Sequence, residues 1–364
     1  MEQNRDQAGK MIIREPITKI EGYKAGKTVE EVKKEYGLDK IVKLASNENP
    51  YGASPEAIKA FKSFDKLHMY PQRDPPELKE KIAEYLGVDV NRIVLGAGID
   101  GILENIFKLV VAEGDEIINS VPSFLYYPIL VSISNGKEIR LQRRDDFSID
   151  VENVKESINS KTKLIMVCSP NNPTGNVEGI EDIRDLAEST DALIFIDEAY
   201  AEFSSKNMLS LSEYENVVIG RTFSKAFGMA NLRLGYAVIP KQLKDYFYRV
   251  STPFPFSTPA QMAAMAALDD IQYLQMVVDK TISERDRITQ KLKELGVKVY
   301  PSESNFVFAE LPVESSVLFE KLLRKGVIIR DCSSIKGCNK YHTRISVGKE
   351  DENDVLLNTL EEVL

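Results

Sequence analysis

A lysine lies in a turn rich in small and hydroxyl residues, in the segment Thr222-Phe-Ser-Lys225-Ala-Phe-Gly. The turn follows the apolar run 217–220, and α/β proteins bind their ligands where such strands end. Desolvation there lowers the pKa of a lysine, as an imine-forming amine requires. Thr222, Ser224 and Arg233 could donate to a phosphate group. A surface lysine with an unrelated arginine would explain this segment equally well.

Two other apolar runs also end in polar residues. Residues 164–168 lead into Ser-Pro-Asn-Asn172-Pro, where Asn172 can donate from its amide, although a plain turn would have this composition too. Residues 192–196 lead into Asp197-Glu-Ala-Tyr200, which reads either as an acid and a phenol sharing a site or as a helix N-cap with a core tyrosine. Together the three strand ends offer what pyridoxal phosphate needs: a lysine, a carboxylate, ring-oxygen donors and a phosphate cup.

Positioning these residues requires a sheet. From about residue 90 the chain alternates short apolar runs with helical patterns, which predicts an α/β architecture with a mostly parallel sheet covered on both faces. The segments 305–311, 326–330 and 343–347 look like strands around the helix 315–323 and predict a smaller α+β unit. We expect an N-terminal segment (1–40) packing on that unit or on a partner subunit, a large unit (41–265) and a small unit with its linking helix (266–364).

Composition argues against several other classes of protein. A net charge of −9 with no basic stripe argues against nucleic acid as a partner. The three cysteines and two histidines fit no metal-ligand spacing, and the pair Cys332 and Cys338 is read as reduced thiols, with a labile disulfide as the alternative. No apolar run reaches the length of a membrane span, and the polar N-terminus is no secretory signal, so we expect a cytoplasmic protein.

Taken together, the motifs resemble those of the fold-type I aminotransferases, and within them the histidinol-phosphate aminotransferases. The resemblance covers nearly the whole chain. It rests on residues 44–52, 69–72, 169–175, 197–203, 222–235, 302–306, 326–331 and 344–348. It implies a seven-stranded, mostly parallel sheet in the large unit and pyridoxal 5'-phosphate as the cofactor.

The resemblance also implies roles for individual residues around the cofactor. Lys225 would hold it as an imine, with Asp197 on the ring nitrogen and Tyr200 as a third catalytic group. Asn172 and Tyr200 would bind the ring oxygen. The remaining cofactor contacts would be Thr222, Ser224, Arg233 and the turn at Ile99 and Asp100 on the phosphate, Phe124 stacked on the ring, and Tyr51 reaching the cofactor of a partner subunit in a homodimer.

The implied substrate residues are Tyr23, Asn47, Arg330 and Arg344, although Arg330 beside Asp331 could instead form a surface ion pair. The implied reaction moves an amino group between L-histidinol phosphate and 2-oxoglutarate, giving imidazole-acetol phosphate and glutamate in histidine biosynthesis, with ping-pong kinetics. Two departures from the family's pattern stand out: the turn Gly98-Ile-Asp-Gly, and Pro253-Phe-Pro-Phe-Ser-Thr-Pro near the expected substrate pocket.

The same residues also fit other functions. An aromatic amino-acid aminotransferase is the main alternative, and Phe254 and Phe256 would suit its pocket. A threonine-phosphate decarboxylase would use the same cofactor and release CO2. A non-catalytic cofactor sensor would need a DNA-binding domain, for which the chain before Asn47 has no room. Fold-level analogy alone does not decide between substrates.

Overall fold

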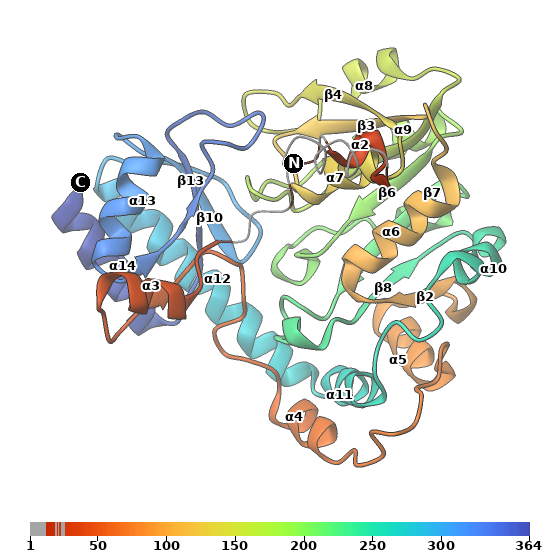
Figure 1. Ribbon diagram of the computed structural model, residues 1–364, viewed down its shortest axis with the longest axis horizontal. Helices are drawn as coiled ribbons and strands as arrows, with labels where there is room; N and C mark the ends of the chain where they lie inside the picture. The colour runs from red at the N-terminus through yellow and green to blue at the C-terminus, as the bar shows by residue number, and fades with distance from the viewer. Residues whose placement is uncertain (1–11, 19, 21, 23–25) are drawn as a thin grey trace, which may run out of the picture.

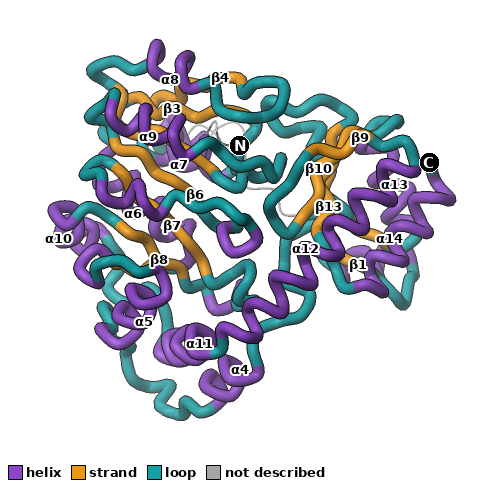
Figure 2. Tube along the Cα trace, turned by 180° about the vertical axis from the view of Figure 1, so that it is seen from behind, coloured by secondary structure: helices purple, strands orange, loops and turns teal. Residues whose placement is uncertain are grey.

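The computed structural model describes residues 12–18, 20, 22 and 26–364 of the chain. Two units lie next to each other, one built on a seven-stranded sheet and one on smaller sheets (Figure 1). Helix α12 (Ile271–Glu294) runs from the first unit into the second, where it packs against β9 (Lys298–Tyr300) and β10 (Phe306–Glu310) (Figure 2).

The larger sheet confirms the predicted mostly parallel, seven-stranded arrangement. Its strand order is β2 (Ile93–Gly96), β8 (Gly235–Val238), β7 (Val217–Thr222), β6 (Leu193–Asp197), β5 (Thr162–Cys168), β3 (Glu116–Val121) and β4 (Lys137–Gln142). Only β8 runs antiparallel to its neighbours. The sequence pattern identified five of these strands and missed β4 and β8. Strand β4 lies at the sheet edge and is only half-buried, so its apolar pattern is weak.

Helices cover both faces of this sheet. On one face, α5 (Pro76–Leu86), α6 (Gly98–Val110) and α7 (Tyr126–Ile133) pack against Met166, Phe195 and Val218. On the other face, α8 (Val151–Ser157) and α9 (Ile180–Glu188) pack against the alternate residues Val167 and Ile196. Because side chains alternate along a strand, both sets must be apolar, which explains the uninterrupted apolar runs.

The second unit contains a four-stranded antiparallel sheet. Its strand order is β12 (Arg330–Asp331), β13 (His342–Ser346), β10 (Phe306–Glu310) and β9 (Lys298–Tyr300). Helices α12, α13 (Ser315–Arg324) and α14 (Glu350–Val363) cover one face, where Val307 and Ile345 lie in a shared core. The opposite face contacts the first unit, as the contact of Phe306 with the ring of Tyr200 shows.

The N-terminal part of the chain contacts both units. Strand β1 (Val42–Lys43) pairs with β11 (Val327–Ile328) of the second unit, and Val32 of α3 (Val29–Tyr36) packs on Leu323 of α13. Helix α2 (Glu15–Thr18) instead lies against α7. Helix α11 (Thr258–Asp269) packs on α4 (Pro55–Lys62) and α5. It contains residue 265, so the unit boundary expected there falls inside a helix.

The linking helix expected at the start of the small unit corresponds to α12, which is separated from α11 by a turn at Asp270. The Asp270 side chain caps α12 at the amide of Tyr273. Helix α10 (Lys241–Val250) lies against α6. Within the described ranges, no helix is both long and apolar enough to cross a membrane.

Candidate active site

A cavity of about 570 Å³ lies where the carboxyl ends of β5, β6 and β7 face the four-stranded sheet. Parallel strands bring their carboxyl ends to one edge of a sheet, so segments far apart in sequence meet there. All but two of the residues predicted from the sequence line this cavity: Asn47, Ile99, Asp100, Phe124, Asn172, Asp197, Tyr200, Thr222, Ser224, Lys225, Arg233, Arg330 and Arg344.

The two exceptions are Tyr51 and Tyr23. Tyr23 lies outside the described residues. Tyr51 does not line the cavity; its carbonyl accepts a hydrogen bond from the Tyr273 hydroxyl (2.8 Å), and Lys280 Nζ lies 5.3 Å from its ring centroid. The loop that carries it packs on the turn after Lys225, where a Cβ at Gly228 would lie 2.3 Å from the carbonyl oxygen of Gly52.

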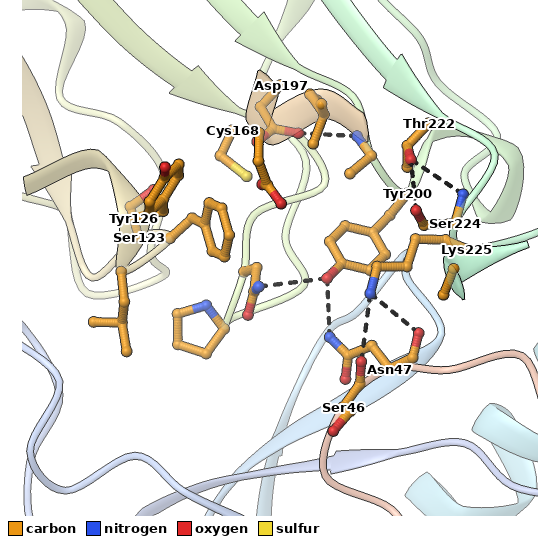
Figure 3. Close-up of a pocket in the computed structure, with 18 of the residues that line it drawn as sticks. Ser46, Asn47, Ser123, Tyr126, Cys168, Asp197, Tyr200, Thr222, Ser224 and Lys225 are labelled. Carbon is orange, nitrogen blue, oxygen red and sulfur yellow. Dashed lines mark hydrogen bonds between the residues drawn. The ribbon is translucent and has the colours of Figure 1, made fainter. Parts of the chain in front are cut away.

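Lys225 projects into the cavity from the turn that follows β7 (Figure 3). Its Nζ donates to the carbonyl oxygens of Ser46 (3.4 Å) and Asn47 (3.3 Å) and lies 5.7 Å from the ring centroid of Tyr200. Burial lowers the pKa of Lys225 to about 8, and the positive charge of Arg344 acts in the same direction. An appreciable fraction of this amine is therefore neutral near physiological pH.

Asp197 is the last residue of β6 and is only 3% exposed. Burial raises the pKa of Asp197 to about 6. Two donors oppose that rise: the Tyr127 hydroxyl donates to Oδ2 (2.7 Å), and the Ala199 amide donates to Oδ1 (3.1 Å). The carboxylate is therefore ionised at neutral pH in spite of its burial.

Tyr127 is a functional residue that the sequence did not reveal. It lies on α7, fully buried, with its ring edge-to-face against Phe124 at 5.5 Å between centroids. In the sequence it belongs to the apolar run 125–131, which reads as core. Its position three residues after Phe124, across the turn that leads into α7, was the available signal.

An amide and a phenol meet opposite Lys225. The Tyr200 hydroxyl accepts hydrogen bonds from Asn47 Nδ2 (3.0 Å) and Asn172 Nδ2 (3.4 Å). Arg344 Nη1 donates to Asn172 Oδ1 (2.5 Å), which turns the amide NH2 of Asn172 towards Tyr200. Burial also raises the pKa of Tyr200, so its hydroxyl keeps its proton.

Asn47, predicted to contact substrate, has its side chain committed to the protein. Its backbone is left-handed (φ 54°) and its side chain is 1% exposed. The Ser346 hydroxyl accepts from the Asn47 amide and donates to Asn47 Oδ1, both at 2.8 Å. Asn305 Nδ2 donates to the Asn47 carbonyl (3.0 Å). Asn47 thus links the second unit to Tyr200 and Lys225, a role that depends on long-range contacts.

A cup of donors lies at the start of α6. No side chain caps this helix at Ala97, so its first amides face the cavity without a capping acceptor. Arg233 Nη1 lies 3.5 Å from Ser224 Oγ, and Nη2 donates to Asp100 Oδ2 (3.0 Å). A Cβ at Gly235 would lie 2.7 Å from the amide nitrogen of Ile99, so only glycine lets β8 approach this turn. The cup suits a phosphate group.

Arg344 and Arg330 provide positive charge on the opposite wall. They face each other across β13 and β12, and both line the cavity. Arg344 is 9% exposed, and its Nη2 donates to the carbonyl of Ala45 (2.6 Å). Two guanidinium groups beside one cavity suit an anionic substrate. Among the described residues, no cluster of His, Cys, Asp and Glu is placed to hold a metal ion.

Comparison with known proteins agrees with this geometry. Residues 39–360 match the family model "Aminotransferase class I and II". The chain is 53% identical to "Histidinol-phosphate aminotransferase 1" of Archaeoglobus fulgidus, over 89% of this chain and 99% of that protein. It is 40% identical to "Histidinol-phosphate aminotransferase" of Methanosarcina mazei, over 96% of each chain.

A solved structure gives the same picture at lower identity. The crystal structure of histidinol-phosphate aminotransferase from Sinorhizobium meliloti in complex with pyridoxal-5'-phosphate superposes with a TM-score of 0.87 at 27% identity, covering 96% of this chain and 97% of that one. Coverage of this extent includes both units of the chain. The chain belongs to the class I and II aminotransferase family.

Proposed function

We propose that this chain is a pyridoxal-phosphate-dependent transaminase that exchanges an amino group between L-histidinol phosphate and 2-oxoglutarate, as part of histidine biosynthesis. The products are imidazole-acetol phosphate and glutamate. The observation that carries the proposal is the meeting of Lys225, Asp197 and Tyr200 in one cavity, with Arg330 and Arg344 on its opposite wall. The names of the two relatives at 53% and 40% identity support the choice of substrate.

The donor set fits pyridoxal phosphate. The cup at α6, Ser224 and Arg233 offers N–H and O–H donors to a phosphate, while Asp197 offers a buried carboxylate to a protonated ring nitrogen. Asn172 and Tyr200 offer donors to a ring oxygen. When bound, this cofactor supplies a carbonyl carbon that takes up the amino group and a ring that withdraws electrons from the substrate's α-carbon.

The protein's own residues bind, orient and transfer protons. Lys225 Nζ would hold the cofactor, and as a free amine it would take the α-proton of the amino donor, a role suited to an amine whose pKa is lowered to about 8. Asp197, ionised at neutral pH, holds the proton on the ring nitrogen. Tyr200 and Asn172 fix the ring against rotation. These groups, which transfer protons and orient the ring, all lie on the wall of the cavity that the larger sheet forms.

The arginines account for two different anionic substrates. Histidinol phosphate carries a phosphate monoester, and 2-oxoglutarate carries two carboxylates. A guanidinium fork binds either group with paired hydrogen bonds, so Arg344, with Arg330 beside it, can serve both half-reactions. The aromatic alternative loses its particular support, because neither Phe254 nor Phe256 lines the cavity of this chain; Phe254 stacks on Tyr70 instead.

We further infer a homodimer in which Tyr51 reaches the cofactor phosphate of the partner subunit. Tyr51 lies beside the Lys225 turn without entering its own cavity. Apolar side chains are exposed on the neighbouring α4 and the loop after it: Ile58, Phe61, Leu67, Met69 and Tyr70. A partner subunit would cover such a patch. The cytoplasmic location expected from the sequence stays a prediction.

Mixing two inactive variants tests the shared site. A Lys225→Ala chain and a Tyr51→Ala chain, refolded together, should regain activity, because one of the two sites in a heterodimer then has both wild-type residues. If Tyr51 acted within its own chain, no site in the mixture would be intact and no activity would return. Light scattering on the wild-type protein checks the dimer directly.

A half-reaction titration tests the substrate. The cofactor-loaded protein is mixed separately with histidinol phosphate, phenylalanine and phosphothreonine, and the cofactor's visible absorbance band is followed. We expect fast loss of the band with histidinol phosphate and slow loss with phenylalanine. Faster conversion with phenylalanine would move the assignment to an aromatic aminotransferase, and CO2 release from phosphothreonine would indicate a decarboxylase.

A further inference from the structure

Phe147 lies in the loop between β4 and α8 in an unusual backbone conformation. The three residues before it are exposed, whereas Phe147 itself is buried. Its φ is 64°, in the left-handed region that bulky side chains rarely adopt. Such a conformation persists only where the surroundings impose it, and it is concentrated at functional sites.

A buried ion pair of the first unit holds the backbone of Phe147. The Phe147 carbonyl accepts from Arg143 Nη1 (2.8 Å) and from Asn176 Nδ2 (3.0 Å). Arg143 also pairs with Glu178 at 2.5 Å, and their side chains are 1% and 4% exposed. Glu178 in turn accepts from the Ile149 amide (2.9 Å). The loop is thus fixed from both sides to the larger sheet.

The ring of Phe147 is inserted into the second unit. It packs nearly perpendicular to three rings, one from each of three strands: Tyr300 of β9 at 4.9 Å between centroids, Phe308 of β10 at 5.4 Å and His342 of β13 at 5.8 Å. Cys332 and Ile335 belong to the same cluster, and Ile335 also lines the cavity. A loop of one unit thereby ends in an aromatic pocket of the other.

The pocket and the two arginines share one face of the four-stranded sheet. Tyr300 lies opposite Phe308, Phe308 opposite Arg344, and Arg344 opposite Arg330. Directly opposed residues lie on one face of a sheet, and so do residues two apart on one strand, such as His342 and Arg344. One cross-strand row thus begins in the Phe147 pocket and ends in the guanidinium groups of the cavity.

We propose that Phe147 is a positioning residue: its ring sets how far the sheet face that carries Arg344 and Arg330 stands from Lys225 and Asp197. The role assigned to the arginines rests on the proposed function. The buried pair Arg143 and Glu178 fixes Phe147 to the larger sheet, and the Phe147 ring in turn fixes the sheet face where the substrate's anionic group binds. Substrate affinity then depends on a residue that does not line the cavity.

Steady-state kinetics of Phe147→Leu tests the role. We expect KM to rise about tenfold for both histidinol phosphate and 2-oxoglutarate, with kcat changed much less, because a small displacement of binding groups is costly while Lys225 stays in place. Phe247→Leu is the matched control, since Phe247 is buried even more completely (0% exposed against 8% for Phe147) but lies within the first unit. Phe308→Leu should reproduce the KM rise, and the double variant should be less than additive. Unchanged KM values in Phe147→Leu would overturn the proposal.

Amide hydrogen exchange gives a second readout that needs no substrate. In Phe147→Leu, exchange should accelerate in β9 and β13 and stay unchanged in β6, whereas Phe247→Leu should leave β9 and β13 unchanged. Acceleration spread evenly over both units would mean general destabilisation and would also overturn the proposal. A failure of the proposed function would appear differently, as a wild-type protein that does not turn over histidinol phosphate, and the exchange measurement would still decide the role of Phe147.

Discussion

The two walls of the cavity are built in different ways. On one wall, Asp197 ends β6 and Lys225 follows β7 by three residues, and both strands are buried along their whole length. On the other wall, Arg344 lies in the middle of β13, on a sheet of a different unit that meets the first through side-chain contacts. The first wall cannot shift without disturbing a large core. The second wall is held to the first unit by side-chain contacts across one face of its sheet.

Because the walls differ in this way, we expect them to have different roles in the reaction. Proton transfer requires fixed distances, and the wall of strand ends provides them. Anion binding falls to the attached sheet through Arg344, which also donates to Asn172 of the first wall. Changes on the first wall should therefore lower kcat, and changes on the second should raise KM.

Lys225→Ala should have the largest effect. Removing the amine that attaches the cofactor and transfers the proton should lower kcat by more than about 10⁴-fold. Steady-state transamination measures this, and the visible absorbance band of the loaded protein should disappear with it. Lys163→Ala, at an exposed position of β5, is the control and should behave as wild type. A Lys225→Ala protein with retained activity would remove the basis of the assignment.

Arg344→Ala should have an intermediate effect of another kind. Losing a charge-assisted pair of hydrogen bonds should raise KM about 10- to 100-fold for both histidinol phosphate and 2-oxoglutarate. Arg344→Lys keeps the charge without the planar fork and should fall in between. Arg140→Ala, an exposed arginine of β4, controls for charge alone. If KM changed for neither substrate, Arg344 would not belong to the substrate site.

The first wall was largely predictable from the sequence, and the second was not. Asp197 and Lys225 each follow an apolar run, so the periodicity of buried parallel strands placed them at one sheet edge. Arg330 and Arg344 were singled out only by family resemblance. What brings them together is the pairing of β12 with β13, and the register of two short strands separated by a loop is not encoded locally.

Residues that act through others were the hardest to predict. Asn47 depends on Ser346, almost 300 positions away in the chain, and the aromatic pocket of Phe147 is assembled from three strands. Tyr127 is hidden in an apolar run, and its hydroxyl meets Asp197 only once α7 is docked on the sheet. Composition and periodicity describe which face a residue occupies, but not which polar atom it meets there.

Tyr127→Phe tests the first wall with the smallest expected effect. The Tyr127 hydroxyl donates to the ionised form of Asp197 and thereby lowers its pKa, against the burial that raises it to about 6. Without this donor the pKa rises further, since a hydrogen bond to a charged group contributes roughly 1.5–3 kcal/mol. Activity requires ionised Asp197, so the acid limb of the kcat/KM profile should move to higher pH, while activity at alkaline pH stays near wild type.

The matched control for this prediction is Tyr236→Phe. Tyr236 is equally buried in the same core, and its hydroxyl has no hydrogen-bond partner among the described residues. Removing that hydroxyl should leave the acid limb where it is. An unshifted acid limb in Tyr127→Phe would mean that burial alone sets the ionisation of Asp197, and that the first wall tunes its chemistry by desolvation without help from α7.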